Sequence, residues 1–214
     1  MQNVSSSDRE KHLEALRHEL QETRDLSLDH LAQQIKALGF QCLRCGECCA
    51  GEENSVVVFP FEIRAIRERT GLFWDEVARP PSVGEWDDQG RFHTLEWRLN
   101  KEHGSCKFYR DGECRIYGER PLLCKTYPFF LENGVLGVSE CIGLGHQIGS
   151  DTSQELAALL KRRRIAELEE AIALIEKFRD FSRGLPGRKT ICIVHDSQGM
   201  HMIKADSSDP REGA

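Results

Sequence analysis

The sequence has few aromatic residues, no long apolar run and no excess of basic charge. Aromatic side chains make up only 7% of the 214 residues. No run of 18 apolar residues occurs, so we expect no membrane-spanning helix and no membrane partner. The formal net charge is -6, whereas proteins that bind nucleic acid generally carry a basic surface. We therefore also expect no nucleic-acid partner.

The start of the chain lacks the features of a secretory signal. Residues Met1 to Asp8 have neither a cationic beginning nor an apolar core. We therefore expect a cytoplasmic location. In a reducing compartment, cysteines serve metal or redox chemistry more often than disulfides. This expectation decides how the nine cysteines of the sequence are interpreted.

Eight of the nine cysteines fall into two groups. The first is a C-x2-C-x2-C-C run, and the second is spread over the next hundred residues. Thiolates bind soft or borderline metals, and a zinc ion or a [4Fe–4S] cluster takes four of them. Eight cysteines therefore suffice for two sites. The ninth, Cys192, lies in an apolar run, so we expect it to be a small buried hydrophobe. The predicted metal ligands are Cys42, Cys45, Cys48, Cys49, Cys106, Cys114, Cys124 and Cys141.

The spacing of the first group favours iron–sulfur clusters over zinc. C-x2-C-x2-C opens the ligand run of bacterial ferredoxins, and three ligands so close together are harder to place on one zinc ion. We expect two [4Fe–4S] clusters, with zinc as the alternative cofactor. The adjacent Cys48 and Cys49 are expected to point in different directions and to serve different sites. Cys42, Cys45 and Cys48 would then share one site with a downstream cysteine. Cys49 would join the remaining three.

Two other interpretations of the cysteines stay open at this point. Four of them could hold a structural zinc ion while the other four are unrelated to it. Alternatively, the cysteines could form disulfides, which a cytoplasmic location disfavours. Nitrogen ligands are also available, because His103 and His146 lie near cysteines in the sequence. His195 and His201 flank the last predicted hairpin, and we expect them at the surface.

The segments around the cysteines predict an α+β fold. Apolar spacing indicates helices within residues 8–39 and from about 153 to 182. Residues 91–99 are predicted as one strand, and residues 190–204 as a terminal hairpin. Asp111-Gly112 and Asn133-Gly134 indicate two small hairpins. The predicted architecture is a cysteine-rich metal-binding core with small hairpins, flanked by N-terminal helices and by a long C-terminal helix plus terminal hairpin.

This pattern divides the chain into three regions. They are an N-terminal helical region (1–39), a cysteine-cluster metal-binding domain (40–146) and a C-terminal helix and hairpin (147–214). Within the second region, Arg120 and Pro121 are expected to shape the loop before Cys124, and Arg120 could also donate to sulfur or a carboxylate. In the third, the run 162–164 of three arginines is expected to be solvated or paired with acids.

Several spaced elements together resemble a known family. The chain is similar to the cysteine-cluster family of zinc- or iron-chelating proteins (CxxCxxCC, YkgJ-type). The resemblance covers roughly residues 38–146 and does not extend to the flanking helices or the terminal hairpin. The matching elements are Phe40-x-Cys42-x2-Cys45-Gly46-x-Cys48-Cys49-x-Gly51, Cys106-x-Phe108, Cys114-x-Ile116-Tyr117-x2-Arg120-Pro121-x2-Cys124-x2-Tyr127-Pro128, and Cys141 with Gly143 and Gly145.

The resemblance implies metal chelation by the eight cysteines. Flagellin lysine methylases carry a similar cysteine cluster, so an enzyme such as a protein (lysine) methylase is one alternative. A methyl-donor site would need a glycine-rich loop directly after a clear strand, and the sequence has no such loop. It also lacks the C-x3-C-x2-C spacing of radical enzymes. We expect a metal-binding protein with an accessory redox, maturation or protein-modification role and an unidentified protein partner. A zinc-binding structural or interaction module is the other alternative. No catalytic residue is predicted.

Overall fold

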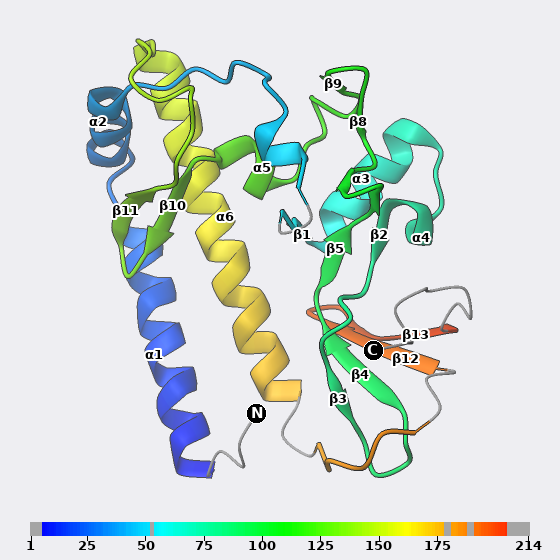
Figure 1. Ribbon diagram of the computed structural model, residues 1–214. Helices are drawn as coiled ribbons and strands as arrows, with labels where there is room; N and C mark the ends of the chain where they lie inside the picture. The colour runs from blue at the N-terminus through cyan, green and yellow to red at the C-terminus, as the bar shows by residue number, and fades with distance from the viewer. Residues whose placement is uncertain (1–5, 52–53, 178–180, 188–190, 205–214) are drawn as a thin grey trace.

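The structure of the 214-residue chain is a computed structural model that describes residues 6–51, 54–177, 181–187 and 191–204 (Figure 1). The helices are α1 (Ser6–Asp25), α2 (Leu28–Leu38), α3 (Pro60–Thr70), α4 (Trp74–Val77), α5 (Leu122–Thr126) and α6 (Ser150–Lys177), with a 3-10 turn η1 (Glu47–Cys49). The strands are β1 (Val57–Val58), β2 (Ala78–Arg79), β3 (Glu85–Trp86), β4 (Phe92–Leu95), β5 (Trp97–Leu99), β6 (Lys101–Glu102), β7 (Ser105–Cys106), β8 (Tyr109–Arg110), β9 (Glu113–Cys114), β10 (Phe129–Glu132), β11 (Val135–Val138), β12 (Ile191–Asp196) and β13 (Gly199–Lys204). The predicted α+β fold class is confirmed.

The N-terminal helices pack along the long helix α6 (Figure 1). The side chain of Ser27 caps α2 by accepting a hydrogen bond from the backbone N–H of His30. Gly39 ends α2 with a φ of 68°, a left-handed value that costs other residues more than glycine. Leu31 and Ile35 are buried from α2 against α6. The sequence predicted both helices and the glycine stop.

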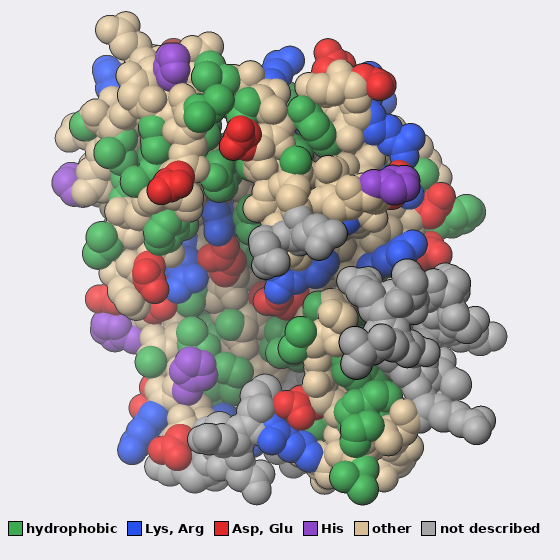
Figure 2. Space-filling model, in the orientation of Figure 1, with side chains coloured by type: hydrophobic (Ala, Val, Ile, Leu, Met, Phe, Trp, Pro, Cys, Tyr) green, Lys and Arg blue, Asp and Glu red, His purple; other side chains and the backbone are tan. Residues whose placement is uncertain are grey.

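Helix α6 begins three residues before its predicted start and ends at Lys177. Residues 178–180, within the predicted helix, lie outside the described residues, and residues 181–182 are not helical. Two of the three arginines of α6 are paired with acids, which agrees with the prediction that this run is solvated or acid-paired, whereas the guanidinium carbon of Arg162 lies 5.6 Å from the centre of the Phe61 ring. Arg163 lies 2.7 Å from Glu167, and Arg164 lies 2.6 Å from Glu19 on α1. Acidic and basic side chains are interspersed on the face drawn in Figure 2.

The prediction of one strand over residues 91–99 was wrong. Glu96 has a φ of 68°, and this left-handed residue splits the segment into β4 and β5. Strand β4 joins a four-stranded sheet in the order β13-β12-β4-β3, whereas β5 lies between β1 and β2. The terminal hairpin β12–β13 is confirmed, and Thr190 at its predicted start lies outside the described residues. The parallel pairing of β12 with β4 was not predicted, because strand pairing over about one hundred residues leaves no local signal.

Two apolar cores flank the cysteine region. One contains Ile63, Trp97 and Ile116, with Cys106 and Cys114 packed against it. The other joins α2, α6 and β10. The predicted hairpins β8–β9 and β10–β11 are both present, turning at residues 111–112 and 133–134. Strands β6, β7, β8 and β9 have only two residues each, and hairpins of this size have little stability of their own.

Contacts cross the boundaries between the three regions predicted from sequence. Strand β12 pairs with β4, and α6 packs on α5 and β10 as well as on the N-terminal helices. The division into regions stays a prediction. In the described part of the chain, no helix combines the length and apolar character needed to cross a bilayer.

Candidate metal centre

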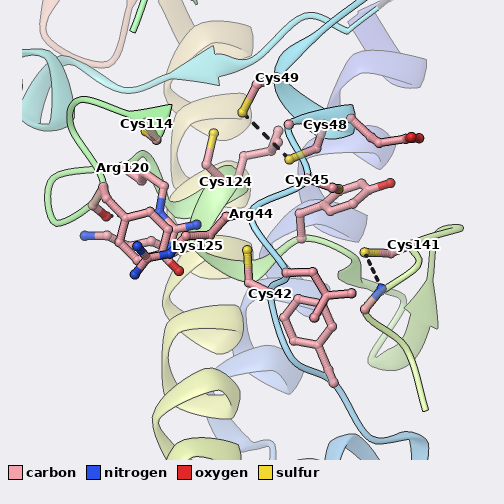
Figure 3. Close-up of a pocket in the computed structure, with 18 of the residues that line it drawn as sticks. Cys42, Arg44, Cys45, Cys48, Cys49, Cys114, Arg120, Cys124, Lys125 and Cys141 are labelled. Carbon is pink, nitrogen blue, oxygen red and sulfur yellow. Dashed lines mark hydrogen bonds between the residues drawn. The ribbon is translucent and has the colours of Figure 1, made fainter. Parts of the chain in front are cut away.

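All eight cysteines predicted as metal ligands line one cavity of about 910 Å³. Figure 3 shows how the cysteines that it labels are distributed around this space. Cys42, Cys45 and Cys48 are exposed, the other five are half-buried, and all are free thiols. Cys192 does not line the cavity and is 4% exposed in the first core, which confirms its predicted role as a small buried hydrophobe.

The loop that carries the first four cysteines turns at Gly46. This residue has a φ of 83° and precedes the 3-10 turn η1. A Cβ atom at this position would collide with the phenol ring of Tyr109. The hydroxyl of Tyr109 also donates to the backbone carbonyl of Cys45 over 3.4 Å. Gly46 therefore lets the hairpin β8–β9 pack directly against the cysteine loop.

An antiparallel bridge joins the two ends of the cysteine region. Phe40 pairs with Leu144. One hydrogen bond lies on each side of this pair. The N–H of Gln41 donates to the carbonyl of Gly143 over 2.9 Å, and the N–H of Gly145 donates to the carbonyl of Gly39 over 3.1 Å. A Cβ atom on Gly143 would collide with the carbonyl oxygen of Gln41, so the close approach needs glycine at this position. The bridge places the segment that enters the loop at Cys42 beside the segment that leaves the cavity after residue 141.

The remaining three cysteines come from separate short elements. Cys106 ends β7, Cys114 lies opposite Tyr109 in the hairpin β8–β9, and Cys124 lies on α5. Each of these elements is too short to hold its own position. Their attachment to the neighbouring core therefore determines where the three thiols lie.

Glu62 on α3 anchors the helix that carries Cys124. Its carboxylate accepts the backbone N–H of Leu122 over 2.6 Å and that of Phe59 over 2.9 Å. Glu62 is only 6% exposed, and this burial raises the pKa of its carboxyl group. One buried side chain thus ties the start of α3 to the start of α5.

The adjacent thiols of Cys48 and Cys49 stay close together. Their sulfur atoms are 3.9 Å apart, so the prediction that the two side chains point in different directions was wrong. The 3-10 turn η1, which contains both residues, keeps them on the cavity side. The hydrogen bond between them lowers the pKa of Cys48 to about 6 and raises the pKa of Cys49. The two thiols therefore titrate as a coupled pair with one shared proton.

Burial and mutual repulsion raise the pKa of two further thiols. Burial raises the pKa of Cys124 to about 12, and the charge of Cys106 adds to the effect. Burial likewise raises the pKa of Cys106, with a contribution from the charge of Cys114. Cys106 and Cys124 also act on Cys49. The thiols of Cys49, Cys106, Cys114 and Cys124 are therefore near enough to influence one another electrostatically.

The donor set fits a soft or borderline metal, although the thiols are spread around the cavity. Within the described residues, no three His, Cys, Asp or Glu side chains converge as a ready-made coordination group. The cavity nevertheless gathers eight thiols from separate segments of the chain, and thiolate is the donor that zinc and iron–sulfur clusters share. Neither His103 nor His146 lines the cavity, so the structure brings neither of these alternative ligands to it.

Sequence reasoning missed a second cluster of titratable side chains, in the four-stranded sheet. Nδ1 of His93 lies 2.8 Å from Nε2 of His195, and Nε2 of His93 lies 2.9 Å from the carboxylate of Asp87. All three are buried, so the expectation that His195 is a surface residue was wrong. Burial alone would raise the pKa of Asp87, but hydrogen bonds from Arg91 and His93 hold it below its usual value. The unpredicted β4–β12 pairing brings the two histidines together.

These features define an α+β protein built around a thiol-lined cavity suited to a soft metal. Residues 41–142 match the model of the CxxCxxCC family, described as "putative zinc- or iron-chelating domain". The resemblance inferred from the motifs is thus confirmed over this segment. The matched segment includes all eight cavity cysteines, and the match supports metal binding as the function of this domain. No curated protein and no solved structure matches the chain.

Proposed function

We propose that this protein binds two [4Fe–4S] clusters through the eight cysteines of the cavity and serves an accessory redox, maturation or protein-modification role. The observation that carries the proposal is that eight thiols line one cavity, although they come from segments spread over residues 42–141. Two clusters with four cysteine ligands each would use all of them. The ninth cysteine is in the core, which leaves eight for metal.

Backbone pairing supports Cys141 as the fourth ligand of the first site. The bridge between Phe40 and Leu144 brings the beginning and end of the cysteine region together. Cys42, Cys45, Cys48 and Cys141 would then form one ligand set. The charges of Cys141, Cys48 and Cys45 all help to raise the pKa of Tyr127, after the larger effect of burial. Three members of this ligand set are therefore close enough to the phenol of Tyr127 to interact with it electrostatically.

The second ligand set would be Cys49, Cys106, Cys114 and Cys124. Electrostatic interactions link Cys49 to Cys106 and Cys124, and link Cys106 to Cys114. Cys48 of the first set acts on Cys49, Cys106 and Cys124 as well, so these interactions show that the two sets are neighbours and do not by themselves divide them. Two of these cysteines lie on two-residue strands. A cluster would hold these short elements in place, because the free energy of metal binding also stabilises the fold around it.

The exposure of the first ligand set supports a role with a protein partner. Three of its four thiols are exposed, so a cluster held by them would lie close to the surface. Solvent exposure and hydrogen bonding set the potential of such a cluster. A partner that covered this surface would change both, which suits electron transfer, redox sensing or delivery of a cluster.

One distance favours zinc as the second candidate. A tetrahedral zinc site with Zn–S bonds of about 2.3 Å has neighbouring sulfurs about 3.8 Å apart. The sulfurs of Cys48 and Cys49 are 3.9 Å apart, so both could bind the same zinc ion. The function would then be that of a structural or interaction module. In that case Cys48 and Cys49 would belong to the same ligand set, contrary to the assignment proposed for two clusters.

Metal analysis of anaerobically purified protein tests the proposal. Two [4Fe–4S] clusters predict about eight iron and eight sulfide per chain, with broad absorbance near ~400 nm. Colourless protein with about two zinc ions would support the second candidate. Protein that takes up neither metal, even after reconstitution, would contradict both.

Single-cysteine variants test the division into two ligand sets. Cys42→Ser and Cys49→Ser should each lose about half of the bound iron, because each removes a ligand from a different cluster. Cys192→Ala serves as the matched control, since Cys192 does not line the cavity, and should keep the full amount. Loss of all metal in Cys49→Ser would count against two separate sites.

A further inference from the structure

Three cationic side chains lie on the wall of the thiol cavity. They are Arg44 from the cysteine loop, Arg120 from the segment before α5, and Lys125 from α5 itself. Figure 3 shows all three beside the thiols. Arg44 is exposed, whereas Arg120 and Lys125 are half-buried. Positive charge is therefore present both at the mouth of the cavity and within it.

A tyrosine ring holds the two arginines in place. The guanidinium carbon of Arg120 lies 3.7 Å from the centre of the Tyr117 ring, and that of Arg44 lies 4.3 Å from it. Nε of Arg120 also donates to the backbone carbonyl of Tyr117 over 3.0 Å. A guanidinium stacked on an aromatic face keeps its remaining N–H groups available in the plane. Stacking thus holds the two arginines in place and leaves donors for a further acceptor.

These cations have no acidic partner within the described residues, unlike other basic side chains nearby. Arg110 pairs with Glu102 and Arg115 pairs with Asp111, both on the neighbouring hairpins. Three glutamates line the cavity as well, at positions 47, 140 and 155. None of them forms an ion pair with the three cations in the described part of the chain. Among the described residues, these three positive charges therefore face the cavity without an ion-paired carboxylate, and the longer-range attraction between Lys125 and buried Glu62 acts on one of them only.

The cavity also has space and apolar surface beyond what thiol ligands need. Its volume of about 910 Å³ lies near the upper end of the range for small-molecule sites, about 300–1,000 Å³. Val56, Ile116 and Leu123 line it together with the thiols and the cations. A mostly apolar wall with a few fixed polar groups is the usual composition of a small-ligand site.

We propose that Arg44, Arg120 and Lys125 form a subsite for a small carboxylate- or phosphate-bearing molecule, bound beside the metal thiolates. The inference deepens the proposed function and rests on it in one respect, because the ligand would lie next to the metal-binding thiols. Carboxylate and phosphate match the planar fork of donors that arginine presents. Lys125 adds a third charge. The subsite would position an anionic substrate or effector at the metal centre.

Charge compensation is the competing explanation for the same cations. Arg120 lies near enough to Cys48 and Cys124 to favour their charged forms, so it could serve only to balance the metal thiolates. Charge compensation would need neither free N–H donors for another ligand nor a tyrosine ring that holds the arginines in place. The two explanations differ in what happens when a cation is removed: anion affinity falls in one, and metal content falls in the other.

Calorimetric titration of the anaerobically purified, metal-containing protein distinguishes them. The probes are adenosine 5′-monophosphate for the phosphate arm and glutarate for the carboxylate arm, with adenosine as the uncharged control. We expect at least one anion to bind and adenosine not to bind. Arg44→Gln and Arg120→Gln should each weaken binding about tenfold or more, the effect of losing a charged hydrogen bond. Arg24→Gln, which removes a charge paired with Glu169 on the helical side, should leave affinity unchanged.

Two tyrosine variants make the test independent of overall charge. Tyr117→Phe keeps the aromatic face and should retain anion affinity, whereas Tyr117→Leu removes the platform and should lose it. Metal content is measured for every variant. The inference is overturned if neither anion binds, if the arginine variants bind as wild type does, or if they lose metal in proportion to affinity. The two proposals can fail separately: if the protein takes up neither iron nor zinc, even after reconstitution, but still binds an anion, only the proposed function is contradicted.

Discussion

Two clusters of reactive side chains lie in different parts of this molecule. One is the set of eight thiols around the cavity, and the other is the buried chain Asp87–His93–His195 in the four-stranded sheet. In the sheet, each member hydrogen-bonds to the next, and Asp87 accepts additional bonds from the backbone at Gln89 and Arg91. Around the cavity, side chains face open space, and the only thiol–thiol hydrogen bond described joins Cys48 to Cys49.

The difference separates a structural network from a site prepared for ligands. Buried polar groups normally find partners within the protein, and a fully satisfied network rigidifies the fold around it. The sheet network meets that condition with its own residues. The cavity does not. Within the described residues its three cations form no ion pair with a carboxylate, and its thiols have few hydrogen-bond partners apart from the Cys48–Cys49 pair and the Gly143 N–H that donates to Cys141. Metal and an anion would supply the missing partners. The two clusters are therefore expected to respond independently when one of them is perturbed.

Removal of metal should give the largest effect, and it should be confined to the cavity half. Strands β6, β7, β8 and β9 have two residues each, so without metal their thiols lose the link that holds them together. We expect a chelator to remove amide protection from residues 42–49 and 105–142, a loss of several kcal/mol locally. Strands β4 and β12 should stay protected. Hydrogen exchange with mass spectrometry, with and without chelator, measures both. Equal loss in β4 and β12 would contradict the separation.

Disruption of the sheet network should have the opposite pattern. Asp87 accepts from Arg91 Nε over 2.6 Å and pairs with buried His93. Asp87→Ala leaves these groups without their partner, at a cost of about 3–5 kcal/mol. Bound metal should be unchanged under native conditions. Urea unfolding and metal analysis provide the two measurements. The neighbouring exposed Asp88 supplies the control, and Asp88→Ala should cost under about 0.5 kcal/mol. A loss of metal in Asp87→Ala would show that the clusters are coupled.

The same network predicts a dependence of stability on pH. Burial, followed by the charge of His93, lowers the pKa of His195 from 6.5 to about 4. Between these values the unfolded chain binds more protons, so the free energy of unfolding falls as pH drops from about 6.5 to about 4. The loss is at most about 3 kcal/mol. Urea unfolding of the wild type and of His195→Gln over this pH range tests the prediction. Both proteins share the metal centre, and only the wild type has the pH-dependent contribution of His195 to the free energy of unfolding.

The control for that experiment is an exposed histidine. His18 on α1 is exposed, with 75% of its side chain accessible, so His18→Gln should follow the wild-type pH profile. If His195→Gln also follows the wild-type profile, the sheet network is not the origin of the pH dependence. A flatter profile for His195→Gln alone supports the assignment.

Local signals were enough to predict much of the cavity but not the sheet network. Cysteine spacing, the turns at residues 111–112 and 133–134, and the Gly39 stop each act within a few residues, so the sequence displays them directly. The β4–β12 pairing and the left-handed Glu96 depend on contacts about one hundred residues away. For the same reason, the sequence contained no sign that His93 and His195 would meet. The stacking of Arg44 and Arg120 on Tyr117 joins separate segments and could not be read from either segment alone.

The smallest expected effect compares two glycines and concerns the shape of the cavity. Gly46 and Gly71 both have left-handed backbones, with φ of 83° and 73°. A Cβ atom would meet nothing near Gly71 but would collide with Tyr109 at Gly46. Both alanine variants should lose about 1 kcal/mol of stability from backbone strain. Only Gly46→Ala should also lose bound metal, because Tyr109 must move away from the cysteine loop. The double variant Gly46→Ala with Tyr109→Ala removes the collision and should recover metal. If it does not recover metal, backbone strain in the loop, and not the contact with Tyr109, determines the position of the thiols.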